Sequence, residues 1–245
     1  MSSKVARSTV MSSTPLNPAA RHRLDAVSDV TDAPPTHWSV IVPVKQTSLG
    51  KSRLAGLRAE QRRALALAFA LDTVTAAAST VGVRRVVVVT NDPDASAFER
   101  IGADVLPDRP DAGLNPAFVH GAQHVAQIDP ESGVLGLAGD LPALTTEVLG
   151  SVLRVAPSGR WFVPDAAGTG TTLLAASSEM RLSPSFGPHS RAAHRAGGAQ
   201  EVDLPGIARL RRDVDTEVDL WDAVRLGVGA HTQEALSRHE LLKLA

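Results

Sequence analysis

Four short, almost wholly apolar runs recur between residues 38 and 138, and polar or amphipathic stretches separate them. The runs are Trp38–Val44, Arg85–Thr90, Ala103–Leu106 and Gly133–Ala138. Strands of this kind are buried on both faces, as in a parallel sheet covered by helices. Between the first two runs, residues 59–80 place Leu67, Leu71, Val74 and Ala78 on one helical face. The alternation therefore predicts an α/β fold, a mostly parallel sheet with helices on both faces.

The chain before Trp38 has a different composition. Residues 1–37 are rich in Ser, Thr, Ala and Pro and show no apolar period. Such a stretch cannot bury enough apolar area to offset the entropy lost on ordering. We therefore predict a disordered tail over residues 1–37 and one domain over residues 38–245, in which residues 160–215 form a substrate-binding extension. Further helices are expected over about 115–127, 216–227 and 231–243.

The bulk composition argues against several classes of protein. A formal net charge of -1 and an aromatic content of 3%, with no Tyr, provide neither the basic field nor the stacking platforms of nucleic-acid binders. The absence of Cys excludes disulfides, thiolate metal ligands and cysteine nucleophiles. The sequence contains neither a run of roughly 18 apolar residues, as a membrane span needs, nor the apolar core of a secretory signal. We expect a cytoplasmic enzyme without nucleic acid or membrane partners.

A cationic loop follows the first predicted strand. Gly50-Lys51-Ser52 is similar to the end of a phosphate-binding P-loop, but the position of that motif's first Gly is held by Lys45. The loop therefore offers Lys45, Lys51 and Arg53 either as a solvated basic segment or as a clamp for a triphosphate. Ligands of parallel sheets bind beyond the carboxyl ends of the strands. Because the 45–53 loop lies at that edge, together with residues 90–92, 107–115 and 140, the clamp is favoured.

Three aspartates have the spacing of metal ligands. Asp140 stands at the end of a buried strand, and Thr145 or Thr146 is a better cap than Asp140 for the helix that follows. In the extended segment Asp213-Val214-Asp215, alternation puts both carboxylates on one side of the chain. Magnesium prefers one or two carboxylates plus phosphate oxygens of the substrate. The alternative for Asp215 is that it caps the helix beginning near Thr216.

Two further segments are candidates for anion binding. Gly168-Thr169-Gly170-Thr171-Thr172 supplies backbone N–H groups and hydroxyls, although it lacks the third Gly of a dinucleotide fingerprint. Phe186-Gly187-Pro188-His189-Ser190 leads into a short helix over 191–195, for which we expect Ser190 as the N-cap. The start of that helix is either an anion site or an ordinary capped helix end.

Taken in order, these motifs resemble the guanylyltransferases of deazaflavin coenzyme F-420 biosynthesis, over a stretch from about Trp38 to Gly229. Archaeal members are called 2-phospho-L-lactate guanylyltransferase, and actinobacterial members phosphoenolpyruvate guanylyltransferase. The resemblance implies a nucleotidyltransferase fold of Rossmann-like type. It also implies that GTP and phosphoenolpyruvate give enolpyruvoyl-2-diphospho-5'-guanosine and pyrophosphate. The same chemistry on 2-phospho-L-lactate or another phosphorylated three-carbon acid is the alternative.

The resemblance also implies roles for individual residues. Asp140, Asp213 and Asp215 match the magnesium ligands of the family. Thr171, Gly187 and Ser190 match the residues that hold phosphoenolpyruvate. Lys45, Lys51 and Arg53 match the triphosphate clamp, and Asn115 is suggested as a nucleotide contact. Rival interpretations are a sugar or molybdopterin nucleotidyltransferase, which usually has a Gly-rich loop after the first strand, and a nucleotide-binding regulator without catalysis.

Overall fold

The structure is a computed structural model, and it describes residues 37–46, 54 and 56–241. The predicted tail, His37 apart, lies outside the described residues, and so do Lys51 and Arg53. The predictions made for those positions therefore stay predictions.

A seven-stranded sheet forms the centre of the described domain, in the order β3-β2-β1-β4-β6-β5-β7. Its strands are β1 (Trp38–Pro43), β2 (Val83–Val89), β3 (Asp104–Leu106), β4 (Gly133–Leu137), β5 (Arg160–Pro164), β6 (Thr171–Ala176) and β7 (Gln200–Glu201). The pairs β1/β2, β1/β4, β2/β3 and β5/β7 are parallel. Only β6, among the strands described, runs antiparallel to its neighbours β4 and β5. The predicted mostly parallel sheet is confirmed.

Eight helices occur in the described part of the chain: α1 (Ala59–Ala78), α2 (Ser96–Glu99), α3 (Leu114–Ile128), α4 (Thr146–Arg154), α5 (Ser190–Ala196), α6 (Ala208–Arg211), α7 (Glu217–Leu226) and α8 (Ala230–Arg238). The helices predicted over 59–80, 115–127 and 216–227 are confirmed to within two residues. Thr145 caps α4, accepting from the backbone N–H of Val148, as expected. None of these helices is both long and apolar enough to span a membrane.

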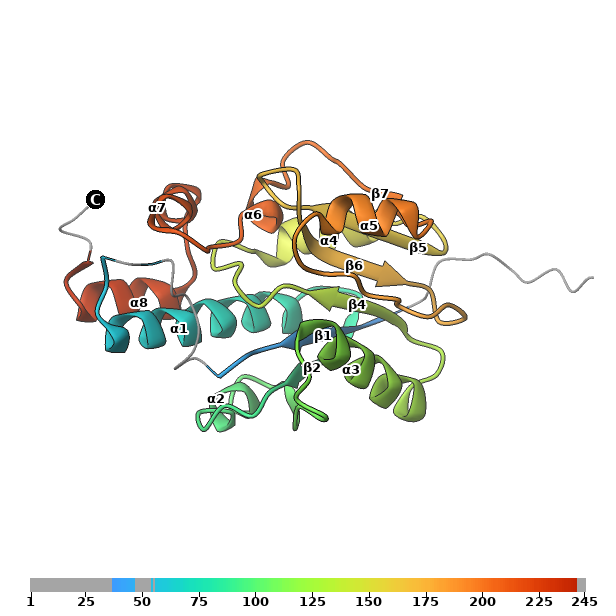
Figure 1. The fold of residues 1–245 in the computed structure, drawn as a ribbon, viewed down its shortest axis with the longest axis horizontal. Coiled ribbons are helices and arrows are strands. Elements are labelled where there is room, and N and C mark those ends of the chain that lie inside the picture. Colours follow the sequence, from blue (N-terminus) through green and yellow to red (C-terminus); the bar gives the residue numbers. More distant parts are fainter. Residues whose placement is uncertain (1–36, 47–53, 55, 242–245) are drawn as a thin grey trace, which may run out of the picture. The chain divides into compact units, whose positions relative to one another are not determined.

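Helices lie on both faces of the sheet (Figure 1), and an apolar core fills the layer between the sheet and the helices on each face. Val40 and Val42 of β1 belong to a core with α1 and α4, whereas Ile41 between them belongs to a core with α3. Successive residues of a strand point to opposite faces, so a strand buried on both sides must be apolar throughout. The continuous apolar run at the start of the domain is thereby explained.

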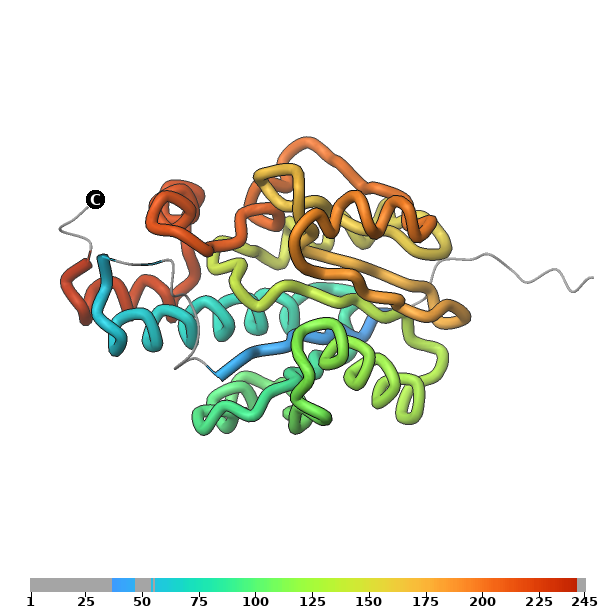
Figure 2. Tube along the Cα trace, in the orientation of Figure 1, coloured from blue at the N-terminus to red at the C-terminus, as the bar shows by residue number. Residues whose placement is uncertain are grey.

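The last helix packs on the first one. Figure 2 shows the red helix α8 alongside the cyan start of α1, and Phe69 and Leu236 belong to one apolar cluster. The buried Asp72 of α1 accepts hydrogen bonds from the backbone N–H groups of His231 (3.0 Å) and Thr232 (2.9 Å). These groups lie in the first turn of α8, where N–H groups lack helical partners. Asp72 thus provides hydrogen-bond acceptors for the free N–H groups at the start of α8, more than 150 residues away in the sequence.

Candidate active site

A pocket of about 300 Å³ lies beyond the carboxyl ends of β1 and β2. Its lining includes Lys45, Asn91, Asp108 and Gly113. The side chain of Asn91 bonds both the N–H and the carbonyl oxygen of Asp108, each at 3.0 Å, and so joins the end of β2 to the loop after β3. Lys45 and Gln46, the described start of the predicted 45–53 loop, therefore line one pocket with residues of the two other predicted loops, 90–92 and 107–115. Lys45 is exposed there, where a phosphate chain could reach it.

The segments that carry the metal-ligand candidates meet at the next strand along this edge, β4. Gly139, after β4, packs so closely on β1 that a Cβ there would lie 3.3 Å from the carbonyl oxygen of Pro43. The backbone N–H of Val214 donates to the carbonyl oxygen of Asp140 at 3.1 Å. This bond places the segment of Asp213 and Asp215 directly beside Asp140, although 73 residues of sequence separate Asp140 from Asp213.

The carboxylates of this region repel one another. Burial, followed by the charges of Asp140, Asp165 and Asp215, raises the pKa of Asp213 to about 7. Both causes disfavour the ionised form of a carboxyl group, because the charge loses water and meets like charges. Carboxyl groups with shifted pKa values are common at functional sites, where a bound cation or substrate balances their charge. The electrostatics thus point to a cation as the natural partner of this cluster.

The side chains can be compared with what a hard divalent cation needs. Within the described residues, no three His, Asp or Glu side chains converge closely enough to enclose a metal ion. Magnesium does not require such a cage, because it keeps several waters and takes one or two carboxylates together with phosphate oxygens. The donor set consists of carboxylate oxygens whose like charges raise the pKa of Asp213, and it fits that requirement. Asp140, Asp213 and Asp215 are the residues that would hold the ion.

The alternative role considered for Asp215 is not supported. Helix α7 is capped by Thr216, whose hydroxyl oxygen accepts from the backbone N–H of Asp219 at 3.3 Å. In return, the carboxylate of Asp219 accepts from the N–H of Thr216 at 2.9 Å. This reciprocal pair is a capping box. Asp215 therefore lies one residue before the cap and does not serve as the cap itself.

Asp165, at the end of β5, is a member of the cluster that sequence reasoning missed. Its Oδ1 accepts from the N–H of Thr169 at 2.9 Å, and its own N–H donates to the carbonyl oxygen of Gly170 at 3.2 Å. Its charge is also among the causes of the raised pKa of Asp213. Asp165 therefore connects the carboxylates to the turn before Thr171. The signal was present, since Asp165 follows a buried apolar strand just as Asp140 does.

The predicted acceptor residues surround the start of α5. Thr171 is the buried first residue of β6, and the backbone N–H of Arg191 donates to the carbonyl oxygen of Thr169 at 3.1 Å. This bond sets α5 against the strand. Gly187 has φ +130°, a conformation that other residues rarely adopt, and a Cβ there would meet nothing within 4 Å. Thr171, Gly187 and Ser190 thus belong to neighbouring segments.

The prediction that Ser190 is the N-cap of this helix is wrong. His189 holds the cap position with φ 60°, and Ser190 is the first helical residue, with only 2% of its surface exposed. Serine is favoured at N-caps because its side chain can accept from the first turn. Here burial against the rest of the site decides the position of Ser190 instead.

Asn115 makes contacts that the sequence did not reveal. Its amide nitrogen donates to the carbonyl oxygen of Phe186 at 2.9 Å, and its amide oxygen accepts from the N–H of Phe186 at 2.8 Å. Both ends of the side chain are therefore engaged with the loop that carries Gly187. The nucleotide contact suggested for Asn115 stays a prediction.

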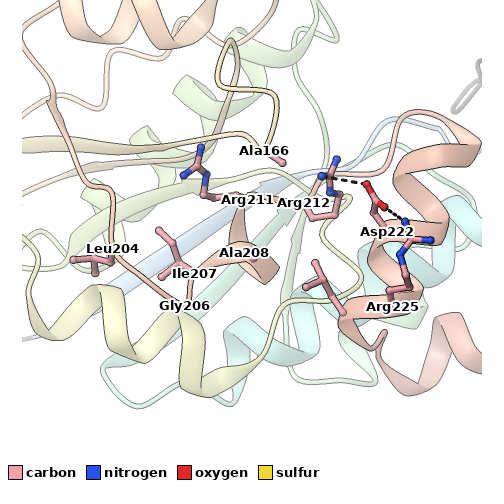
Figure 3. A pocket seen from close by; sticks show the side chains of 10 residues that line it. Ala166, Leu204, Gly206, Ile207, Ala208, Arg211, Arg212, Asp222 and Arg225 are labelled. Carbon is pink, nitrogen blue, oxygen red and sulfur yellow. Dashed lines mark hydrogen bonds and ion pairs between the residues drawn. The ribbon is translucent and has the colours of Figure 1, made fainter.

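An open hollow of about 610 Å³ adjoins the cluster on the side of Arg211 and Arg212. In the close-up of Figure 3, Asp222 lies between Arg212 and Arg225 and pairs with both. Arg211 pairs with Asp203 at 2.9 Å and donates to the carbonyl oxygen of Asp165 at 3.0 Å. The arginines that line this hollow already form ion pairs with acidic side chains. They therefore hold the carboxylate segments in place, and they do not take over the role of the predicted triphosphate clamp.

Comparison with known proteins gives a consistent assignment. Residues 50–203 match the family described as MobA-like NTP transferase domain. Phosphoenolpyruvate guanylyltransferase of Thermomonospora curvata is 47% identical over 203 residues, which cover 82% of this chain and 89% of that protein. The enzyme of the same name from Streptomyces scabiei is 49% identical over 208 residues, covering 82% of this chain and 96% of that protein.

Among solved structures, a protein of Desulfovibrio desulfuricans G20, provisionally described as a nucleotide-diphospho-sugar transferase, superimposes with a TM-score of 0.60. The match covers 83% of this chain and 95% of that one at 16% identity, which shows a shared fold only. The sequence relatives carry the assignment further than the fold does. The chain is a nucleotidyltransferase and belongs to the phosphoenolpyruvate guanylyltransferase family.

Proposed function

We propose that this chain joins GTP to phosphoenolpyruvate, giving enolpyruvoyl-2-diphospho-5'-guanosine and pyrophosphate, as a cytoplasmic step of coenzyme F-420 biosynthesis. The names of the relatives support guanylyl transfer to phosphoenolpyruvate, and the resemblance of the motifs suggests the products and the pathway. One structural observation supports it above the others: the carboxylate segments lie between the two predicted binding regions. Gly139, next to Asp140, packs on Pro43 of the Lys45 pocket, and Asp165 accepts from Thr169 in the turn before Thr171. A donor and an acceptor held on either side of shared carboxylates are what a nucleotidyl transfer needs.

The proposed step needs no general base. An oxygen of the acceptor's phosphate attacks the α-phosphorus of GTP, a new phosphorus–oxygen bond forms, and the bond to the β-phosphate breaks to release pyrophosphate. A phosphate monoester has its second pKa near 6 and is largely dianionic at neutral pH, so no proton has to be removed. The obstacle is charge, since two unit charges 4 Å apart repel by about 4 kcal/mol at an effective dielectric of 20.

The residues of the chain divide that task among them. Magnesium, when bound, would neutralise and polarise the phosphates that meet at the site. Asp140, Asp213 and Asp215 would hold it, and Asp165 adds to the negative charge that attracts it. Lys45 faces the pocket from the end of β1, and Lys51 and Arg53 would complete the triphosphate clamp. Thr171, Gly187 and Ser190 would orient the acceptor, which limits its motion before attack.

The reaction can be tested with the purified chain, GTP and Mg²⁺, with pyrophosphate release as the readout. Phosphoenolpyruvate, 2-phospho-L-lactate and 3-phosphoglycerate are supplied in separate reactions, and ATP replaces GTP in a parallel series. We expect turnover with GTP and phosphoenolpyruvate. Turnover only with 2-phospho-L-lactate would reassign the acceptor, and turnover with none of these acids would refute the proposal.

Asp140→Asn tests the metal site in the same assay. The substitution keeps the shape of the side chain but removes the charge, so it should lower kcat by a factor of about 10² to 10³, equal to several kcal/mol in the barrier. Asp104→Asn on the exposed edge strand β3 is the matched control, and it should leave turnover unchanged. Near-normal turnover of Asp140→Asn would refute the assignment of the metal ligands.

A further inference from the structure

A buried histidine lies behind the predicted acceptor residues. Ser190 and His194 are four residues apart on α5 and are its two buried side chains, exposing 2% and 3% of their surface. Residues at this spacing share one face of a helix. The Nδ1 atom of His194 lies 2.9 Å from Oγ1 of Thr171, so the inner face of α5 meets the first residue of β6.

The hydrogen bond made by the other ring nitrogen of His194, Nε2, determines which nitrogen of the ring carries the proton. The backbone N–H of Ser185 donates to Nε2 at 2.9 Å, and a nitrogen that accepts a hydrogen bond carries no proton. The proton of the neutral ring must therefore be on Nδ1, which then donates to Oγ1 of Thr171. Burial, and to a lesser extent the charge of Arg160, lowers the pKa of His194 to about 4, so the ring stays neutral near pH 7.

This tautomer determines what Thr171 can offer a ligand. A hydroxyl group has one hydrogen and can accept two hydrogen bonds. With His194 donating, the hydrogen of Thr171 remains available for an anionic oxygen. In the opposite tautomer, Thr171 would donate to Nδ1 and present only lone pairs, which repel an anion.

We infer that His194 is a positioning residue for the phosphorylated acid. By donating a hydrogen bond to the hydroxyl oxygen of Thr171, His194 leaves the hydrogen of that hydroxyl free to bond the phosphorylated acid. By accepting from the N–H of Ser185, it fixes the loop that carries Gly187. The inference rests on the proposed role of Thr171 in acceptor binding. His194 itself is buried and acts on the substrate only through Thr171 and Ser185.

The ring is held firmly enough for this task. Phe186 packs edge-on against it with ring centroids 5.2 Å apart, and Phe162 contacts it at 5.8 Å. Asn115 secures the next residue of the same loop through both groups of its amide. The loop from Ser185 to Ser190 is thus tethered at two successive residues, by His194 at Ser185 and by Asn115 at Phe186.

The test is a double-mutant cycle with Thr171→Val and His194→Gln, read as KM for phosphoenolpyruvate and for GTP. Each single variant should raise the acceptor KM by about tenfold or more, the effect of one hydrogen bond to a charged group. The amide oxygen introduced by His194→Gln can still accept from the N–H of Ser185, so this variant removes only the hydrogen bond to Thr171. The double variant should therefore be no worse than Thr171→Val, because both changes remove the same interaction. The KM for GTP should not change in any of them.

Two further variants separate positioning from mere stability. His194→Asn places an amide nitrogen near the position of Nδ1 and should restore much of the acceptor affinity that His194→Gln loses. Ser132 lies just before β4, at the end of that strand opposite to the site. Ser132→Ala removes its buried hydroxyl, whose Oγ lies 2.9 Å from Oγ of Ser39 in β1. It should lower the melting temperature without changing either KM.

The outcomes are distinguishable. If Thr171→Val raises the acceptor KM while His194→Gln does not, or if their effects add fully, the inference is wrong and the proposed function stands. If Thr171→Val leaves the acceptor KM unchanged, the proposed role of Thr171 is wrong and the inference falls with it. A long-range ¹H–¹⁵N spectrum gives a readout besides activity: we expect a neutral His194 ring protonated on Nδ1, and protonation on Nε2 would overturn the inference.

Discussion

Gly170 packs against the carboxylate of Asp165 so tightly that a Cβ at position 170 would lie well inside van der Waals contact with Oδ2. Any larger residue must displace a group that belongs to the carboxylate cluster. The glycine is therefore required by the neighbouring acid, and its own backbone conformation is not the reason.

Gly170→Ala should consequently reduce turnover. A displacement of about 1 Å at a site can cost on the order of 10²-fold in rate, and we expect kcat/KM to fall by that order. Gly150→Ala in α4 is the control, because a Cβ there would lie 3.5 Å or more from its neighbours. Alanine in a helix is favoured over glycine by about 0.5–1 kcal/mol, so the control should melt slightly higher with normal turnover. Normal turnover of Gly170→Ala would contradict the placement of Asp165 in the site.

Asp213→Asn should stabilise the metal-free protein in a pH-dependent way. The folded state holds the proton of Asp213 more tightly than the unfolded state, since its pKa is raised from 3.8 to about 7. Ionisation of Asp213 therefore costs stability above pH 7, and the cost disappears as the pH falls below 7 towards 3.8. We expect the variant to melt about 2–4 °C higher than the native chain at pH 8, which corresponds to about 1 kcal/mol for a chain of this size.

Magnesium provides the complementary measurement. An ion that binds the folded state alone raises the melting temperature. Titration with Mg²⁺ at pH 8 should therefore stabilise the native chain and have little effect on Asp213→Asn. Equal stabilisation of both proteins would show that Asp213 does not hold the ion.

His194 should give the stability of the folded chain a different dependence on pH. Its folded-state pKa is lowered from 6.5 to about 4, so the unfolded chain binds the extra proton first as the pH falls. The stability of the native chain is full above pH 6.5 and declines between 6.5 and 4. Relative to His194→Gln, the native chain should lose about 2 kcal/mol between pH 7 and pH 5. Denaturant unfolding at the two pH values checks this, because the difference between the proteins cancels the shared titration of Asp213. A difference that does not vary with pH would show that His194 is not buried as a neutral ring.

The sequence was sufficient for features that depend on local pattern. The sequence alone predicts the location of Asp140, because the carboxyl end of an apolar strand lies at the ligand-binding edge of a parallel sheet. Asp165 follows a strand in the same way. However, the edge of the sheet at which β5 ends depends on how β5 pairs with the antiparallel strand β6, and no local sequence pattern predicts that pairing. The side of the sheet at which Asp165 emerges is therefore a property of the assembled topology.

Long-range hydrogen bonds set the remaining limits of prediction. Serine is a common N-cap residue, yet Ser190 is the buried first residue of the helix, and His189 holds the cap position. Asn115 bonds Phe186, 71 residues further along the chain, and no spacing rule connects two such positions. Residue type indicates what a side chain is able to bind, whereas the fold decides which partner is near.

Asn115→Ala distinguishes the two roles considered for that residue. The loop of Phe186 loses both hydrogen bonds to the amide, so the KM for phosphoenolpyruvate should rise several-fold while the KM for GTP stays constant. Hydrogen exchange should also show faster loss of protection at the N–H of Phe186, which no longer has an acceptor. Asn91→Ala is the matched control, because its amide ties together the pocket of Lys45 and should affect the KM for GTP instead. A rise in the KM for GTP with Asn115→Ala, at unchanged acceptor KM, would establish Asn115 as a nucleotide contact.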